Sequence, residues 1–306
     1  MPEFANPEIY RLVLEELLTG VYVIDCEHKI HFWNSGAERI TGHLCQEMIG
    51  RPMPENTFAG KPNDEAGAGR EHSPLLEAIR EGKPIQTSAY IRHKNGHSVP
   101  VHLRAIPIRN GQNKLIGAAA CFDENTSVSE WNRRRIKLAE FGCIDDEAGV
   151  PNREFVLTQL RECLDAFNKH HIPFGVLCIE VDRLDHLRTS YGQNAAAKIM
   201  RVVAQTLENS LRPTDWLGRW TDRRFLAILT ECSAVAFGKI GERLQNMVSC
   251  SETEWWGDRI SVTISINGAA TMPGDSVESI LDRVQESLPA DAGNGASSKT
   301  PEQRIV

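Results

Sequence analysis

The 306-residue sequence lacks several features that would place it in a class at once. No apolar run approaches the ~20 residues that a membrane-spanning helix needs, and no basic segment followed by an apolar core precedes residue 20, so neither a membrane anchor nor a signal peptide is expected. The eight cysteines are scattered without a C-x-x-C pair, which favours buried thiols in a reducing cytosol. Positive charge is not in excess either, because 34 Lys and Arg face 41 Asp and Glu. The net charge of −7 argues against nucleic acid or an anionic membrane as a general partner. We therefore expect a cytoplasmic protein.

The length instead suggests about two domains, and the order of predicted elements changes near residue 143. The first part has β-rich runs at "GVYVID" and "KIHFWN", a short helix over 35–42, a loop over 51–71, a helix over 73–82 and then three strand-like runs. In the second of these runs, apolar residues at every other position alternate with polar neighbours. That alternation is typical of a half-buried antiparallel strand.

This part of the chain resembles a PAS sensor domain. The resemblance covers residues 8–126 and rests on the order β-β-α…α-β-β-β and on the head "GVYVID…HFWNSGAERITGH…MIGRPMPE". It implies a five-stranded antiparallel sheet with helices, a pocket for an unidentified ligand, and frequent dimerisation.

A charged segment, "TSVSEWNRRRIKLAEFG", follows and predicts a connector helix over 127–142. Its apolar positions, Val128, Trp131, Leu138 and Phe141, step by three, seven and three residues, which approximates a heptad seam. We expect the seam to pair across a two-fold axis, so that the protein is a homodimer through the PAS domain and this helix.

From residue 145 onward, helical and strand patterns alternate, which predicts a sheet flanked by helices. Three segments carry a resemblance to the GGDEF family of diguanylate cyclases over residues 143–290: "DDEAGVPNREFV", "CIEVDRLDHLRTSYGQ" and "GRWTDRRFLAIL". The last stands where the family has its signature hairpin. The expected fold class is therefore mixed α/β (α+β), and residues 291–306 are expected to form a disordered tail.

The resemblance also implies which residues would hold the substrate GTP and its Mg²⁺ ions. The signature positions read Thr221, Asp222, Arg223, Arg224 and Phe225, so two arginines replace two acids. Mg²⁺ needs carboxylate oxygens, and only a vestigial Glu180 remains at the first metal position. The family's base-reading, transition-state and phosphate positions carry Arg188, Asp185 and Ala292. From this set we expect a chain that is not an enzyme, with no certain cofactor and no metal; Mg²⁺ enters only under the alternative of a residual or atypical diguanylate cyclase.

One motif of the family is retained. "RPTD" provides Arg212 and Asp215 at the spacing of the family's R-x-x-D product-inhibition site, and Arg243 matches a further arginine of some relatives. Arginine pairs bidentately with guanine or phosphate, and a carboxylate accepts from the guanine N–H groups. The expected ligand is cyclic di-GMP. The other alternative is a protein-interaction scaffold that binds no nucleotide. Each of these hypotheses is compatible with a downstream protein partner.

Overall fold

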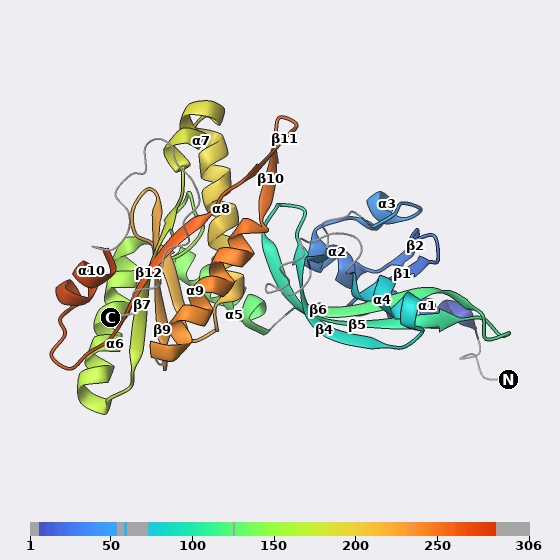
Figure 1. Cartoon of the computed structure of the whole chain (residues 1–306), viewed down its shortest axis with the longest axis horizontal. Helices are drawn as coiled ribbons and strands as arrows, with labels where there is room; N and C mark the ends of the chain where they lie inside the picture. Colours follow the sequence, from blue (N-terminus) through green and yellow to red (C-terminus); the bar gives the residue numbers. More distant parts are fainter. Residues whose placement is uncertain (1–5, 54–57, 60–72, 125, 233, 286–306) are drawn as a thin grey trace. The chain divides into compact units, whose positions relative to one another are not determined.

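The computed structural model describes residues 6–53, 58–59, 73–124, 126–232 and 234–285. The chain forms two compact units, Met1–Ser129 and Glu130–Val306, which are treated separately below (Figure 1). The expected tail over 291–306 and the phosphate position Ala292 lie outside the described residues.

The first unit is an antiparallel sheet with short helices on it. Its elements are α1 (Pro7–Glu16), β1 (Gly20–Asp25), β2 (Ile30–Trp33), α2 (Ser35–Thr41), α3 (Cys45–Met48), β3 (Phe58–Ala59), α4 (Pro74–Glu81), β4 (Ile85–Arg92), β5 (Ser98–Arg109) and β6 (Leu115–Glu124). The strand order is β2-β1-β6-β5-β4-β3. The predicted five-stranded antiparallel sheet is confirmed, and the two-residue β3 extends its edge.

The buried side chain of Asn34 ties the start of this unit together. Its Oδ1 accepts from the backbone N–H of Val21 and of Ala37, the latter in the first turn of α2. Its Nδ2 donates to the carbonyls of Leu14 and Thr19 at 2.8 and 2.9 Å. One amide therefore fixes the end of α1, the first strand and the N-terminus of α2, because Asn can cap a helix and donate at the same time.

Helix α1 itself buries no residue in this unit. Tyr10, Val13, Leu14 and Leu17, which is the residue after the helix, stand at positions i, i+3, i+4 and i+7 and are 61%, 55%, 39% and 38% exposed. An apolar stripe at helical spacing normally faces a core, so this face of α1 is left without apolar cover among the described residues.

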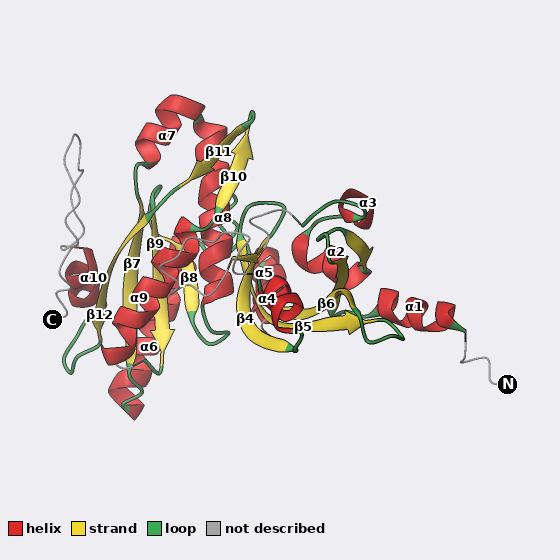
Figure 2. Ribbon diagram, turned by 45° about the vertical axis from the view of Figure 1, so that its right-hand side comes forward, coloured by secondary structure: helices red, strands yellow, loops and turns green. Residues whose placement is uncertain are grey.

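The second unit is a sheet with helices on both faces (Figure 2). Its elements are α5 (Thr126–Glu140), which starts at the boundary, α6 (Arg153–His170), β7 (Phe174–Val181), α7 (Leu184–Tyr191), α8 (Gln193–Ser210), β8 (Trp216–Arg219), β9 (Arg224–Thr230), α9 (Ala234–Ser249), β10 (Glu252–Trp255), β11 (Asp258–Ser261), β12 (Ile264–Ala270) and α10 (Val277–Gln285). The strand order is β12-β7-β9-β8, with every pairing antiparallel. Residues 258–270 form two strands, β11 and β12, because β11 pairs with β10 in a separate hairpin.

The central strand β7 is buried along its whole length, as its continuous apolar run predicted. Val176 and Cys178 pack with α6 and α10 on one face, whereas Leu177 and Ile179 pack with α7, α8 and α9 on the other. Consecutive side chains of a strand point to opposite faces, so a strand covered on both faces carries no polar alternation. Glu180 is the first acidic residue along this strand.

The connector helix α5 packs against the second unit, and this corrects the predicted seam. Trp131 is only 3% exposed, and its ring meets Trp216 of β8 edge-on with 6.1 Å between centroids. Phe141, another predicted seam residue, is 78% exposed. The heptad pattern therefore does not form one free apolar face, because Trp131 is buried in the second unit.

No helix in the described part of the chain combines the length and the apolar character that crossing a membrane requires.

Candidate functional site

The signature hairpin joins β8 to β9 through residues 220–223, as predicted for this segment. Glu180 and Arg224 are direct register partners of β7 and β9. Arg224 Nε donates to Glu180 Oε2 at 2.6 Å, and Arg223 Nε lies 3.2 Å from Glu180 Oε1. The Glu180 side chain is only 12% exposed. Both oxygens of the retained carboxylate therefore have guanidinium partners.

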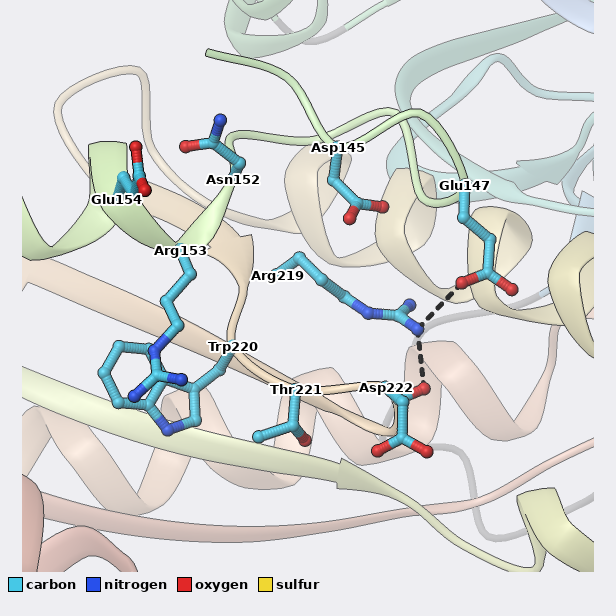
Figure 3. A pocket seen from close by; sticks show the side chains of 9 residues that line it. All are labelled: Asp145, Glu147, Asn152, Arg153, Glu154, Arg219, Trp220, Thr221 and Asp222. Atoms are coloured by element: carbon cyan, nitrogen blue, oxygen red, sulfur yellow. Dashed lines mark hydrogen bonds and ion pairs between the residues drawn. The ribbon is translucent and has the colours of Figure 1, made fainter.

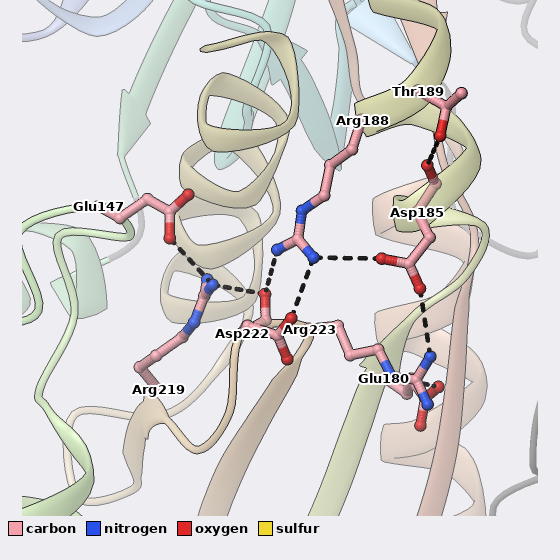
Figure 4. Close-up of polar contacts among 8 residues, drawn as sticks. All are labelled: Glu147, Glu180, Asp185, Arg188, Thr189, Arg219, Asp222 and Arg223. Atoms are coloured by element: carbon pink, nitrogen blue, oxygen red, sulfur yellow. Dashed lines mark hydrogen bonds and ion pairs between the residues drawn. The ribbon is translucent and has the colours of Figure 1, made fainter. Parts of the chain in front are cut away.

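A second set of ion pairs surrounds this one (Figure 4). Arg188 Nη1 lies 3.1 Å from Asp185 and 3.0 Å from Asp222, and Arg223 Nη1 lies 3.6 Å from Asp185. The hydrogen bond from Arg188 lowers the pKa of Asp222, although partial burial opposes it. The base-reading position Arg188 and the transition-state position Asp185 are thus joined by opposite charges to each other and to the signature turn, at Asp222 and Arg223.

The hairpin is also held from its other side. Arg219 Nη2 donates to Glu147 Oε2 at 3.1 Å and to the carbonyl of Asp222 at 2.6 Å, and the same carbonyl accepts from Arg188 at 3.3 Å. Burial lowers the pKa of Arg219, and its guanidinium lies 5.5 Å from the ring of Phe225, which is fully buried. Arginines from β8 and α7 therefore meet at the turn.

A cavity of about 410 Å³ opens on the Arg219 side of the turn (Figure 3). Its lining is mixed in charge and consists of Asp145, Glu147, Asn152, Arg153, Glu154, Arg219, Trp220, Thr221 and Asp222. Arg153 covers the ring of Trp220 at 4.4 Å, and four lining residues are exposed: Arg153, Glu154, Thr221 and Asp222.

The surroundings of Glu180 do not fit a divalent cation in this conformation. A hard cation takes several oxygen ligands, but the two groups beside the Glu180 carboxylate are guanidiniums. Within the described residues, no group of three or more His, Cys, Asp or Glu is placed to hold a metal.

The R-x-x-D residues come together at the end of α8. Asp215 is 4% exposed, and its two oxygens accept from the backbone N–H of Arg212 at 2.9 Å and of Thr230 at 3.1 Å. Burial raises the pKa of Asp215, while these two bonds and the charges of Arg212 and Arg243 oppose the rise. The carboxylate is not presented at the surface as the guanine acceptor we expected, because it already fixes the turn that carries Arg212.

The two arginines differ in how tightly they are held. Arg212 is exposed, and within the described residues its guanidinium has no hydrogen bond or ion pair. Arg243, on α9, is half-buried and donates from Nη2 to the carbonyl of Ser210 at 2.6 Å. The site thus offers one free guanidinium and one that is anchored to the last turn of α8.

Trp216 and Glu208 are further neighbours of this turn that no sequence motif indicated. Trp216 directly follows Asp215 and receives Trp131, as described above. Glu208 is 5% exposed, and burial raises its pKa to about 8, against the opposing charge of Arg135 on α5. An acid inside a mostly apolar helix was the only signal that could have drawn attention to it.

Comparison with known families agrees with this arrangement. The model of the family described as "Diguanylate cyclase, GGDEF domain" matches residues 143–296, about half of the chain. The chain belongs to the diguanylate cyclase GGDEF family. The PAS fold matches residues 8–124, so the first unit is a PAS domain and the second is a GGDEF domain.

Two curated relatives bear the name of the family's activity. The probable diguanylate cyclase DgcE of Escherichia coli (strain K12) is 24% identical over 261 residues, which are 83% of this chain and 22% of that protein. Diguanylate cyclase DosC of the same organism is 26% identical over 138 residues, which are 45% of this chain and 30% of that protein. The matched part of this chain therefore spans less than a third of either relative's length. Among solved structures, the GGDEF domain of DgcB from Caulobacter crescentus, in complex with c-di-GMP, is 17% identical at a TM-score of 0.46 and covers 48% of this chain and 85% of that one.

These findings correct one expectation. The prediction that the chain is not an enzyme is wrong, because the matching family is that of diguanylate cyclases and the relatives are named accordingly. The prediction rested on the set of substitutions at the signature turn and at the base-reading, transition-state and phosphate positions, which do not remove the domain from its family.

Proposed function

We propose that this PAS–GGDEF signalling protein binds cyclic di-GMP at the turn that follows α8. The observation that carries the proposal is the convergence of Arg212, Asp215 and Arg243 on one point. Arg243 is 31 positions from Arg212 in the chain, yet both charges act on the Asp215 carboxylate. Two guanidiniums beside a rigid turn suit a ligand with two phosphates and two guanines.

Each residue has a distinct part in this proposal. Arg212 contacts the ligand, because its guanidinium is exposed and free of described partners. Asp215 is a positioning residue, which holds the backbone of Arg212 and of Thr230. Arg243 adds charge beside the turn while its Nη2 stays on the Ser210 carbonyl.

We further propose a cytoplasmic homodimer formed through the PAS domain. The apolar stripe of α1, Tyr10, Val13, Leu14 and Leu17, supports this, since a face of this kind is normally covered in a stable assembly. Trp131 no longer supports a dimer seam, because it is buried against Trp216.

Calorimetric titration of the full chain with cyclic di-GMP tests the main proposal. We expect a binding heat that Arg212→Ala nearly abolishes, while Arg224→Ala, in the signature hairpin, leaves it unchanged. A wild-type chain that gives no heat at high micromolar ligand would overturn the proposed binding site.

A second candidate function is synthesis of cyclic di-GMP from GTP. The observation that favours it is the position of Glu180, a carboxylate at the end of β7 beside the signature hairpin. Product formed from GTP and Mg²⁺ and lost in Glu180→Ala would establish it.

A further inference from the structure

The connector helix α5 is clamped to the GGDEF domain by a small cluster of aromatic and cationic side chains. Trp131 lies edge-on to Trp216, and Phe155 of α6 packs against the same Trp216 ring at 5.4 Å. The Arg134 guanidinium lies 4.6 Å from the Trp216 ring and 5.5 Å from that of Trp131. A cation placed over two indole rings is attracted by both of their faces.

Few described side chains hold α5 on the GGDEF domain, so the helix can dissociate from that domain. A 15-residue helix is marginal on its own, and of its described side chains only Trp131 is fully buried. Ile136 on the same helix is 64% exposed. In addition, Arg134 Nη1 is buried without a hydrogen-bond partner among the described residues, which weakens the docked state.

The residue that receives α5 is continuous with the turn that carries Arg212. Trp216 follows Asp215 directly and is the first residue of β8. Asp215 fixes both the start of the turn, at Arg212, and the end of β9, at Thr230. A displacement of the turn therefore moves Trp216, because Trp216 is bonded directly to Asp215, the last residue of the turn.

The last turn of α8 gives a second connection between the same two places. Arg243 holds the carbonyl of Ser210, and two residues earlier the buried Glu208 carries a carboxyl on which the charge of Arg135 from α5 acts. The end of α8 therefore accepts a hydrogen bond from Arg243 and carries a buried carboxyl within electrostatic reach of Arg135 on the connector.

From these contacts we infer that α5 is a latch coupled to the Arg212 turn: a guanine dinucleotide bound at Arg212 and Arg243 strengthens the docking of α5 on Trp216. The identity of the ligand rests on the proposed function. The physical basis is that a ligand spanning both arginines immobilises the turn, which is directly followed by Trp216, the residue on which Trp131 and Arg134 of α5 pack. In the chain, α5 links the PAS domain to the GGDEF domain. Its docking could therefore respond both to a signal from the PAS domain and to a ligand bound on the GGDEF domain.

Hydrogen exchange of the full chain, followed by mass spectrometry on peptides from α5, tests the latch. Trp131→Ala should raise the exchange rate of α5 at least tenfold, whereas Ile136→Ala, an exposed position on the same helix, should leave it within about twofold of wild type. Arg134→Lys keeps the charge but loses the planar guanidinium, so it should raise exchange by an intermediate factor in a chain that still folds. Equal rates in all four proteins would overturn the docking.

Cyclic di-GMP supplies the test of coupling. It should slow exchange of α5 in the wild type at least fivefold, in the range usual for coupled sites. Because coupling between two equilibria is reciprocal, Trp131→Ala should also weaken binding of cyclic di-GMP, by at most the same factor. Binding with an unchanged affinity in Trp131→Ala and an unchanged α5 would overturn the coupling and leave the proposed function intact. A chain that binds no cyclic di-GMP would overturn both.

Discussion

Arg224 Nε lies 2.6 Å from Glu180 Oε2, and the two residues face each other directly in the register of β9 and β7. The pair sits at the end of a strand that is otherwise apolar, with the Glu180 side chain 12% and the Arg224 side chain 19% exposed. Arg223 completes it at 3.2 Å from the other carboxylate oxygen. Glu180 thus pairs with two partly buried guanidiniums, and Asp185 lies 3.6 Å from that of Arg223.

The first prediction concerns stability. Glu180→Gln should lower the free energy of unfolding by about 2 kcal/mol, less than the about 3–5 kcal/mol for a fully buried pair, because Arg224 loses its carboxylate whereas Arg223 keeps Asp185. Urea unfolding followed by tryptophan fluorescence measures it, since five of the six tryptophans lie in the GGDEF unit. Asp165→Asn, which breaks an exposed surface pair with Lys169, is the control and should cost less than about 1 kcal/mol. Equal losses in the two variants would show that the Glu180 pairs are no stronger than surface pairs.

The second prediction concerns the signature turn. Arg223→Glu removes a guanidinium from beside Glu180 and adds a second carboxylate there, as a hard cation prefers. Formation of cyclic di-GMP from GTP and Mg²⁺ should therefore rise above that of the parent chain. Arg223→Gln, which removes the charge without adding a ligand, is the matched control. If the Glu and Gln variants form product at the same rate, the added carboxylate does not bind the metal.

The third prediction concerns pH. Burial raises the pKa of Glu208 to about 8, whereas an unfolded glutamate ionises near its ordinary value, so the unfolded state releases this proton first. Stability is therefore lost as pH rises from about 5 to 8. Glu208→Gln should stabilise the chain by about 2–4 kcal/mol at pH 8 and by little at pH 5. The exposed Glu162→Gln should show no such pH dependence in urea unfolding, and a Glu208→Gln gain that is flat with pH would contradict an ionisable cause.

The fourth prediction separates the roles of the R-x-x-D residues. Arg212→Ala should weaken binding of cyclic di-GMP by roughly ten- to a hundredfold, the value of about 1.5–3 kcal/mol for a charge-assisted contact. Asp215→Asn keeps the shape but replaces one carboxylate oxygen by a donor, so it should weaken binding and also lower the thermal midpoint. Titration calorimetry and a melting curve measure the two effects. An Asp215→Asn chain with native stability and no binding would restore the carboxylate as a direct guanine acceptor.

The fifth prediction concerns assembly. The full chain should sediment as a dimer at tens of micromolar, and Val13→Glu, in the middle of the α1 stripe, should shift it toward monomer. A charge in an apolar contact is costly to desolvate. Phe141→Glu, at an exposed residue directly after the connector helix, is the control and should leave the dimer unchanged. A wild-type monomer, or a dimer that only Phe141→Glu disrupts, would exclude the α1 contact.

Local patterns in the sequence were sufficient to predict the two folds and the position of the signature hairpin. Strand alternation in β5 and the uniform apolar run of β7 follow from whether one or both faces of a strand are covered. Asn34 and Asn152 stand where their helices begin, and both side chains cap as their type predicts. These are local preferences, which a short stretch of chain carries with it.

The interaction partners of the polar residues, in contrast, depend on the tertiary structure. In the sequence, Glu180 is a retained metal ligand and Asp215 a free acceptor. In the structure, the Glu180 oxygens pair with the guanidiniums of Arg223 and Arg224. The Asp215 oxygens accept from the backbone N–H groups of Arg212 and Thr230. Trp131 fits a heptad seam by spacing, but Trp216, 85 positions later, offers it a buried site in its own domain. The partners of a charge or of an indole are set by segments that are far apart in the chain, and their burial depends on how those segments pack, which no local pattern encodes.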